Sequence, residues 1–182
     1  MYSLLYRQIE KINVCHILFF YYLKPLPLNW PYKIYCHIDA IFGVRVSSFL
    51  QEGLQFEHSK KTGRIKNFSI RNQLVGTFRT DGGIALTIFG ATELLKNKQF
   101  RENCIIPTPE AIPFVSEGRS LFCKHVEWCG SNIRVGSDVA IVNKDDIVLA
   151  TGKALFGYNV MKKYRKGVAV KIREGIKSRI EE

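Results

Sequence analysis

Adjacent carboxylates and closely spaced cysteines are the features of this chain that come nearest to catalytic or metal-binding chemistry. Asp145 and Asp146 are neighbours, but they lie in a polar segment between two apolar runs, the ordinary place of turn carboxylates. Cys123, His125 and Cys129 are close in sequence, yet four tetrahedral ligands at the usual spacings cannot be assembled around them. The sequence therefore predicts neither an acid–base pair nor a metal site.

Other catalytic signatures are missing as well. The glycines at 82–83 are not followed by the Lys-Ser or Lys-Thr pair of a phosphate-binding loop. No motif places a nucleophile on a sharp turn. The five cysteines are odd in number and form no Cys-x-x-Cys pair, which favours a reducing cytoplasm over a secreted disulfide scaffold. We expect a cytoplasmic protein without a cofactor that performs no catalysis alone.

Positive charge is the chemical feature that remains. The chain carries 27 Lys and Arg against 16 Asp and Glu, a net charge of +11, and residues 151–182 contribute +6 of it. Such a surplus suggests a polyanionic partner, with nucleic acid as the first candidate and an acidic membrane surface as the second. A solvated surface on a basic proteome explains the composition equally well.

Short apolar runs in the C-terminal third predict a small β-barrel. The runs are Val139–Val142, Ile147–Phe156 and Val168–Arg173, with turn residues at 136–138 and 143–146. β-Branched runs bounded by Gly, Asn and Asp are typical of strands and hairpins. Three strands at this spacing favour a closed or nearly closed barrel.

The last of these strands predicts a charged outer face. Val168, Val170 and Ile172 fall on one side of it, and Lys171 and Arg173 fall on the other. One side would pack a core while the other presents positive charge, as an RNA-binding module needs.

The segment from Pro113 to Gly175 resembles a PUA domain, the RNA-binding pseudo-barrel of pseudouridine synthases and archaeosine transglycosylases. The matching pieces occur in the expected order: PFVSEGRSLFCKHV at 113–126, IRVGSDVAIVNKDDIVLATGKAL at 133–155 and KGVAVKIREG at 166–175. Ahead of them, Thr108 and Pro109 predict a helix start that Pro113 interrupts and Gly118 ends.

The preceding region predicts an antiparallel meander with two helices. Candidate strands are 54–58, 64–70, 74–79 and 84–89, and candidate helices are 41–50 and 91–98. HIDAIFG at 37–43, KKTGRIKN at 60–67 and LVGTFRTDGGIALTIFGATELL at 74–95 resemble the domain that precedes the PUA domain in archaeal tRNA-guanine transglycosylases. That resemblance implies a helix on an antiparallel sheet, similar to the cystatin fold, and hence an α+β chain.

Four segments are therefore expected. An N-terminal extension occupies residues 1–35, a pre-PUA domain 36–107, a PUA domain 108–176 and a tail 177–182. The apolar run Ile12–Leu23 is shorter than the ~20 residues that a membrane span needs, so no membrane partner is expected. Pro25, Pro27 and Pro31 indicate a linker.

The PUA resemblance implies an RNA-binding surface around the glycine loop and the last strand. Gly118 would let backbone approach a phosphate, Arg119 would grip phosphate oxygens bidentately, and Lys124 would act as a point charge. The implied set is Gly118, Arg119, Ser120, Lys124, Lys153, Lys166, Gly167, Lys171 and Arg173. The alternative to these RNA-binding roles is that Gly118 serves only as a helix cap and that the lysines serve only to keep the protein soluble. Lys162, Lys163 and Arg165 form a secondary basic patch.

The resemblance implies a non-enzymatic RNA-binding role. The transglycosylase chemistry resides in a (β/α)8 barrel of ~250 residues, which is longer than this chain of 182 residues. Its catalytic residues have no counterpart here. One hypothesis is a detached tRNA-binding half that works with a separate catalytic transglycosylase chain. The alternative is a stand-alone PUA protein that binds ribosomal or other RNA in assembly or translation. A third reading is a protein–protein adaptor whose basic face is incidental.

Overall fold

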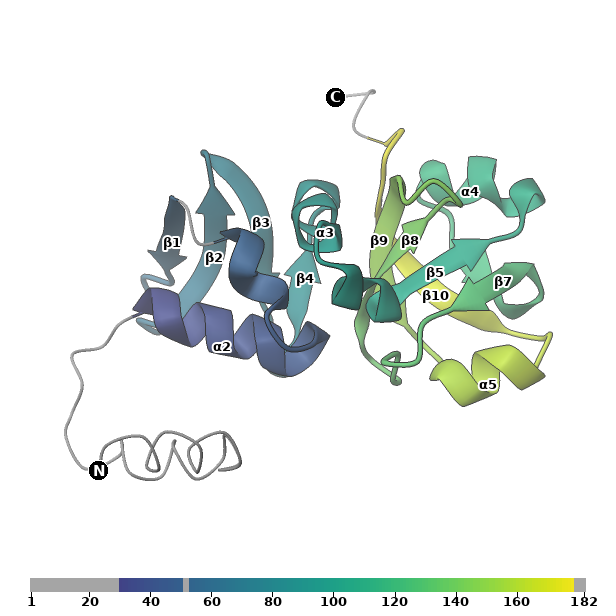
Figure 1. The fold of residues 1–182 in the computed structure, drawn as a ribbon, viewed down its shortest axis with the longest axis horizontal. Helices are drawn as coiled ribbons and strands as arrows, with labels where there is room; N and C mark the ends of the chain where they lie inside the picture. The colour runs from purple at the N-terminus through teal and green to yellow at the C-terminus, as the bar shows by residue number, and fades with distance from the viewer. Residues whose placement is uncertain (1–29, 51–52, 179–182) are drawn as a thin grey trace, which may run out of the picture. The chain divides into compact units, whose positions relative to one another are not determined.

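The computed structural model describes residues 30–50 and 53–178 (Figure 1). Most of the expected N-terminal extension, including the apolar run at 12–23 and the prolines at 25 and 27, lies outside these residues. Pro31 does not belong to a linker. It lies in the first turn of helix α2 (Trp30–Phe42), where a proline is tolerated because its missing N–H would have no helical partner. The described residues from Ile34 onward belong to one compact unit.

The first part of this unit is a four-stranded antiparallel meander in the order β1-β2-β3-β4. Its strands are β1 (Leu54–His58), β2 (Ile65–Ile70), β3 (Gln73–Phe78) and β4 (Ile84–Leu86). Ile34, Ile38 and Phe42 form the buried stripe of α2 and join the apolar core of this sheet. The predicted helix on an antiparallel sheet is confirmed.

The helix predicted at 41–50 is wrong. Helix α2 ends at Phe42, Gly43 has a φ of 121°, and a separate 3-10 turn, η3, spans Val46–Leu50. Asn103 Nδ2 donates to the Phe42 carbonyl at 2.7 Å and Asn132 Nδ2 to the Ile41 carbonyl at 3.1 Å. These distant side chains satisfy carbonyls that a helix end leaves without intrahelical partners, and periodicity cannot reveal them.

The strand predicted at 84–89 is too long, because β4 ends at Leu86 and helix α3 spans Ile88–Leu95 instead of 91–98. The Thr87 hydroxyl accepts a hydrogen bond from the Gly90 N–H at 3.0 Å and so caps the helix. A Cβ at Gly90 would lie 2.0 Å from the Val75 carbonyl oxygen. Only glycine allows α3 to pack this closely on β3. A 3-10 turn, η4 (Lys98–Asn103), follows the helix.

The second part is a six-stranded, nearly closed sheet in the order β6-β10-β9-β8-β5-β7. Its strands are β5 (Cys104–Pro107), β6 (Leu121–Phe122), β7 (Val126–Cys129), β8 (Asp138–Val142), β9 (Val148–Ala154) and β10 (Val168–Gly175). β5 and β8 pair in parallel, and the other pairs are antiparallel. The predicted barrel strands and the hairpin at 143–146 are confirmed.

Short helical elements connect these strands. They are η5 (Pro109–Ala111), α4 (Ile112–Ser116), η6 (Cys123–His125) and α5 (Tyr158–Lys163). Cys123 and His125 therefore lie in a 3-10 turn. The predicted break of the first helix near Pro113 appears as the change from η5 to α4, and Gly118 follows the helix with a φ of 89°.

Strand β5 belongs to the barrel sheet, although the sequence-based boundary at 107/108 assigned it to the first part. It pairs with β8 and β7 and connects those two strands in the sheet. We propose that the domain boundary lies before Cys104.

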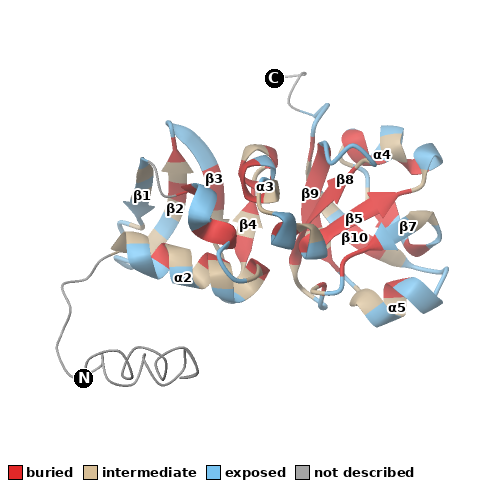
Figure 2. Cartoon of the chain, viewed as in Figure 1, coloured by how far each residue is buried: buried red, intermediate tan, exposed pale blue. Residues whose placement is uncertain are grey.

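The central barrel strands β8 and β9 are buried on both faces (Figure 2). Val139 and Ile141 join the barrel core, whereas Ala140, Val142 and Val148 join the core of the first part. The two parts consequently share a continuous apolar contact across β8 and β9.

Candidate nucleic-acid interface

A pocket of about 370 Å³ lies beside the loop that follows α4. Its lining includes three of the predicted residues, Arg119, Ser120 and Lys124. The exposed rings of Phe114 and Phe122 line it as well. Cationic groups and apolar rings therefore meet in one concave surface, which we call the α4 pocket.

The glycine loop beside this pocket is held from two sides. Gly118 N–H donates to the Val115 carbonyl and Arg119 N–H to the Phe114 carbonyl, both at 3.0 Å. At the end of β10, a Cβ on Gly175 would lie 2.3 Å from the Ser116 carbonyl oxygen and 2.5 Å from the Gly118 nitrogen. Close backbone packing against Gly175 thus fixes where the loop lies.

The segment Lys166–Gly167 adjoins the α4 pocket. The Cys123 N–H donates to the Gly167 carbonyl at 2.9 Å, and Val168 pairs with Phe122 across β10 and β6. Since Lys124 follows Cys123 directly, these bonds bring Lys166 and Gly167 next to Lys124. Six of the nine predicted residues, Gly118, Arg119, Ser120, Lys124, Lys166 and Gly167, therefore belong to one region of the barrel.

The charges of this region are mostly available to a ligand. Arg119 Nε lies 3.4 Å from Glu117 Oε2, and its guanidinium lies 5.5 Å from the centroid of the Phe114 ring. Both members of that ion pair are exposed, so the pair is weak and readily exchanged. Lys124 and Lys166 are exposed and form no ion pair with any carboxylate in residues 30–50 and 53–178.

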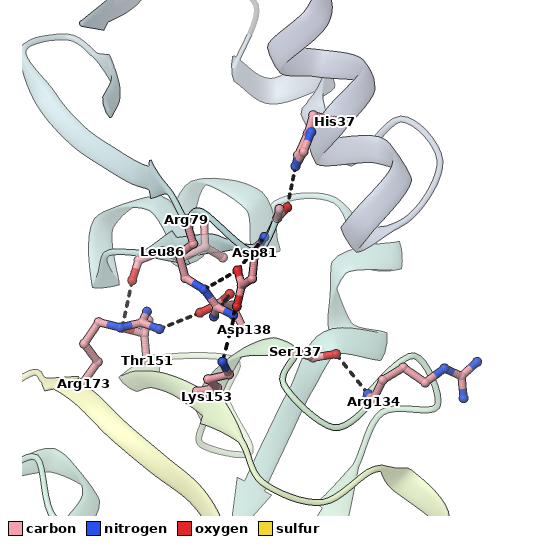
Figure 3. Close-up of polar contacts among 12 residues, drawn as sticks. His37, Arg79, Asp81, Leu86, Arg134, Ser137, Asp138, Thr151, Lys153 and Arg173 are labelled. Atoms are coloured by element: carbon pink, nitrogen blue, oxygen red, sulfur yellow. Dashed lines mark hydrogen bonds and ion pairs between the residues drawn. The ribbon is translucent and has the colours of Figure 1, made fainter. Parts of the chain in front are cut away.

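The other three predicted residues lie elsewhere. Lys153 and Lys171 are paired on β9 and β10, and Arg173 lies two residues further along β10. Lys153 Nζ lies 3.5 Å from Asp81 Oδ2, and Arg173 Nη2 lies 2.7 Å from Asp138 Oδ1 (Figure 3). Lys171 is exposed, whereas Lys153 and Arg173 are engaged with carboxylates.

A polar network at Asp138 links the first part to the barrel (Figure 3). The Asp138 side chain is 3% exposed and accepts from Arg79 Nη1 and Arg173 Nη2, each at 2.7 Å. Arg79 also binds Asp81 through Nε at 2.9 Å and through Nη2. We call Arg79, Asp81, Asp138, Lys153 and Arg173 the Asp138 network.

Two further hydrogen bonds accompany the Asp138 network (Figure 3). His37 Nε2 lies 2.7 Å from the Gly82 carbonyl oxygen. The buried Thr151 hydroxyl donates to the Leu86 carbonyl at 3.0 Å. Sequence reasoning did not identify Asp138, because both of its partners, Arg79 and Arg173, are distant in the chain.

Arg79 holds the pKa of Asp81 well below its usual range, mainly by hydrogen bonding, with a further bond from the Gly83 N–H. A carboxylate whose folded pKa is depressed stabilises the fold above its unfolded pKa of about 4, and this contribution is lost as the pH falls. We expect Asp81→Asn to flatten the loss of stability below pH ~4 in acid-dependent unfolding curves. Unchanged curves would show that the Arg79 contact does not contribute to acid sensitivity.

The cysteines near the barrel are not activated nucleophiles. Burial raises the pKa of the Cys104, Cys123 and Cys129 thiols, and a neutral thiol is a poor nucleophile. Among residues 30–50 and 53–178, no helix is long and apolar enough to cross a bilayer.

Comparison with known proteins agrees with this architecture. Residues 105–176 match the PUA domain family. The chain is 35% identical to the tRNA-guanine(15) transglycosylase of Methanobrevibacter smithii over 80% of its own length, and 36% identical to that of Methanothermobacter thermautotrophicus over 75%. It spans only about a fifth of the length of these relatives, 22% and 21%.

Solved structures share the fold of both parts. A hypothetical protein of Pyrococcus horikoshii superposes with a TM-score of 0.67 at 19% identity, covering 86% of this chain and 96% of that one. A PUA domain protein of Aeropyrum pernix superposes with a TM-score of 0.58 at 14% identity, covering 84% and 85%. Residues 105–176 of the chain thus match the PUA domain family, and the chain resembles a part of the archaeal tRNA-guanine(15) transglycosylases.

Proposed function

We propose that this chain binds structured RNA, with tRNA as its expected ligand, through the α4 pocket and the adjoining Lys166–Gly167 segment. The observation that carries the proposal is the convergence of Arg119, Ser120 and Lys124 in one pocket, with Lys166 in the adjoining segment and two glycine turns beside it. Arg and Lys neutralise phosphates, and turns of this kind let backbone N–H groups come close to them. Recognition of an A-form duplex in this way depends on shape and has low sequence specificity.

We further propose that the chain acts as a non-catalytic accessory to a separate tRNA-guanine transglycosylase. The similarity to transglycosylases extends over about four-fifths of this chain and hence beyond the PUA domain. The matched part is only about a fifth of those enzymes, and in this proposal a separate chain supplies the catalytic (β/α)8 barrel. The accessory would hold the tRNA while that partner exchanges the base.

A stand-alone role in binding ribosomal or other RNA is the second candidate. The observation in its favour is that three solved chains with this fold are covered over 85–96% of their own length, so those chains consist almost wholly of the two parts described for this protein. Affinity purification from native cells separates the two candidates. Co-purification of a catalytic transglycosylase chain supports the accessory role, and co-purification of ribosomal particles supports the second.

The RNA-binding surface is tested by the salt dependence of tRNA affinity, measured by fluorescence anisotropy. The double substitution Lys124→Ala with Lys166→Ala should weaken binding by about tenfold at low salt. It should also reduce the slope of log K against log salt by about 2, one for each phosphate contact.

Lys60→Ala with Lys61→Ala is the matched control. These lysines are exposed in the β1–β2 turn and carry the same total charge. Equal losses in the two double variants, or a slope that does not change, would reject the α4 pocket as the binding surface.

A further inference from the structure

The outer face of strands β9 and β10 carries positive charge outside the α4 pocket. Lys153 of β9 is paired with Lys171 of β10, and Arg173 lies two residues further along β10. Neighbouring cations on one sheet attract polyanions with little regard to sequence or shape. This face differs from the α4 pocket, because carboxylates contact two of its three cations.

The Asp81 carboxylate binds cations as a phosphate group would (Figure 3). Its Oδ2 contacts Arg79 Nη2 and lies 3.5 Å from Lys153 Nζ, and its Oδ1 accepts from Arg79 Nε at 2.9 Å. A guanidinium that contacts both oxygens of an oxyanion, together with an ammonium group, is a common way in which proteins hold phosphate. Asp81 therefore takes the place of a phosphate next to Lys153.

The β3–β4 turn holds Asp81 in this place. The Gly83 N–H donates to Asp81 Oδ1 at 3.1 Å, and the Arg79 N–H donates to the Gly83 carbonyl at 2.8 Å. Gly82 has a φ of 86°, and its carbonyl oxygen lies 2.7 Å from His37 Nε2. Since these bonds fix the turn, the carboxylate loses little conformational freedom when it contacts its cations.

Both partners of the contact between Asp81 and Lys153 are accessible to a competing anion. The Asp81 side chain is 50% exposed and the Lys153 side chain 42%, so solvent screens their attraction and the contact itself is weak. A phosphate that approaches Lys153 also approaches the negative charge of Asp81, and the repulsion between the two anions opposes its binding. The carboxylate thus keeps phosphates away from Lys153 by repulsion.

Arg173 is withheld from phosphates by a buried carboxylate. Its Nη2 lies 2.7 Å from Asp138 Oδ1, and the Asp138 side chain is 3% exposed. Release of Arg173 would leave this buried charge with Arg79 as its remaining cation, which is unfavourable. Lys124 and Lys166 at the α4 pocket, by contrast, form no ion pair with a carboxylate of the described residues.

We propose that Asp81 determines which cations of the barrel bind RNA. Its charge excludes phosphates from the β9–β10 face and so confines RNA to the α4 pocket. A polyanion that does not fit that pocket, such as a DNA duplex, binds weakly for the same reason. The inference rests on the proposed RNA-binding function and assigns part of its specificity to a turn of the first part.

Removing the charge of Asp81 tests the proposal. Asp81→Asn keeps the shape of the side chain. Glu57→Gln is the control, because it also removes one negative charge, from an exposed side chain on β1 that contacts no cation among the described residues. In fluorescence anisotropy at low salt, we expect Asp81→Asn to bind a short DNA duplex about fivefold more tightly, with a dependence of log K on log salt that is steeper by about 1. Glu57→Gln should change the affinity by less than about twofold.

Lys153→Met supplies the second measurement. In the Asp81→Asn background it should remove the gain in DNA affinity, and in the native chain it should change that affinity by less than about twofold. The measurement in the native chain needs no change at Asp81, so it decides the question even if Asp81→Asn fails to fold, which thermal melting shows. A fivefold loss there would mean that Lys153 already binds phosphates and would overturn the proposal.

Binding of tRNA, measured in parallel, separates this inference from the proposed function. If the native chain binds tRNA but Asp81→Asn binds DNA no more tightly than Glu57→Gln, only the role of Asp81 is overturned. If the native chain does not bind tRNA and Asp81→Asn still gains affinity for DNA, the α4 pocket fails as the RNA site and the exclusion by Asp81 stands. If neither binding is observed, both proposals fail.

Discussion

Replacing Asp138 with alanine is expected to lower the free energy of unfolding by about 3 kcal/mol. Its carboxylate is 3% exposed and accepts hydrogen bonds from both Arg79 and Arg173, and breaking a buried ion pair by removing one partner costs about 3–5 kcal/mol. The lower end of this range of costs applies because Arg173 is 37% exposed and Arg79 keeps its contact with Asp81. Urea unfolding followed by circular dichroism measures the change.

Asp145→Ala is the control for this substitution. Asp145 lies in the exposed turn between β8 and β9, where substitutions usually change stability by less than about 0.5 kcal/mol. If the two variants unfold at the same urea concentration, the Asp138 network does not hold the two sheets together. The contact of Arg173 with Asp138 would then have no structural role that competes with the RNA binding that the PUA resemblance implied.

Gly175→Ala is expected to destabilise the fold by about 3 kcal/mol and to weaken RNA binding at the same time. The new methyl group would lie 2.3 Å from the Ser116 carbonyl oxygen and 2.5 Å from the Gly118 nitrogen. Both are backbone atoms that cannot rotate away, so the cost is at the upper end of the range for overpacking. The glycine loop must shift, and loss of one charge-assisted hydrogen bond corresponds to about tenfold in tRNA affinity.

Gly63→Ala is the control for Gly175→Ala, because it also replaces a glycine but creates no steric clash. Gly63 has a φ of 64°, and an added Cβ meets no atom within 4 Å. It should lose stability only through backbone strain, about 1–2 kcal/mol, and keep the native tRNA affinity. Anisotropy at a temperature where all variants are folded compares them. Equal affinities would mean that Gly175 does not position the loop.

Local chemistry made much of the barrel predictable from sequence. The turn between β8 and β9 is specified by Asn143, whose side-chain oxygen accepts from the N–H groups of Asp145 and Ile147, and asparagine is a typical residue for such turns. The alternation in β10 likewise predicted the exposure of Lys171 and Arg173 correctly. Both signals lie within a few residues of the feature that they specify.

What the sequence could not reveal depends on partners far away in the chain. Arg173 and Asp138 are 35 residues apart, and Arg79 and Asp138 are 59 apart. The alternation of apolar and charged residues in β10 predicted that Arg173 points away from the barrel core. It did not predict that Arg173 pairs with a carboxylate on another strand, Asp138. The start of α3 at Ile88 was missed because the apolar alternation of β4 continues into it, whereas the cap at Thr87 marks the true change.

The burial of β8 on both faces limits how this protein can be dissected. Ala140 and Val142 contribute to the core of the first part while their neighbours Val139 and Ile141 fill the barrel. A fragment cut at the start of the PUA match, residue 105, would expose that outer apolar face to water and invite aggregation. A gene fusion or a minimal expression fragment must therefore contain helix α2, the four-stranded sheet and the barrel in one chain.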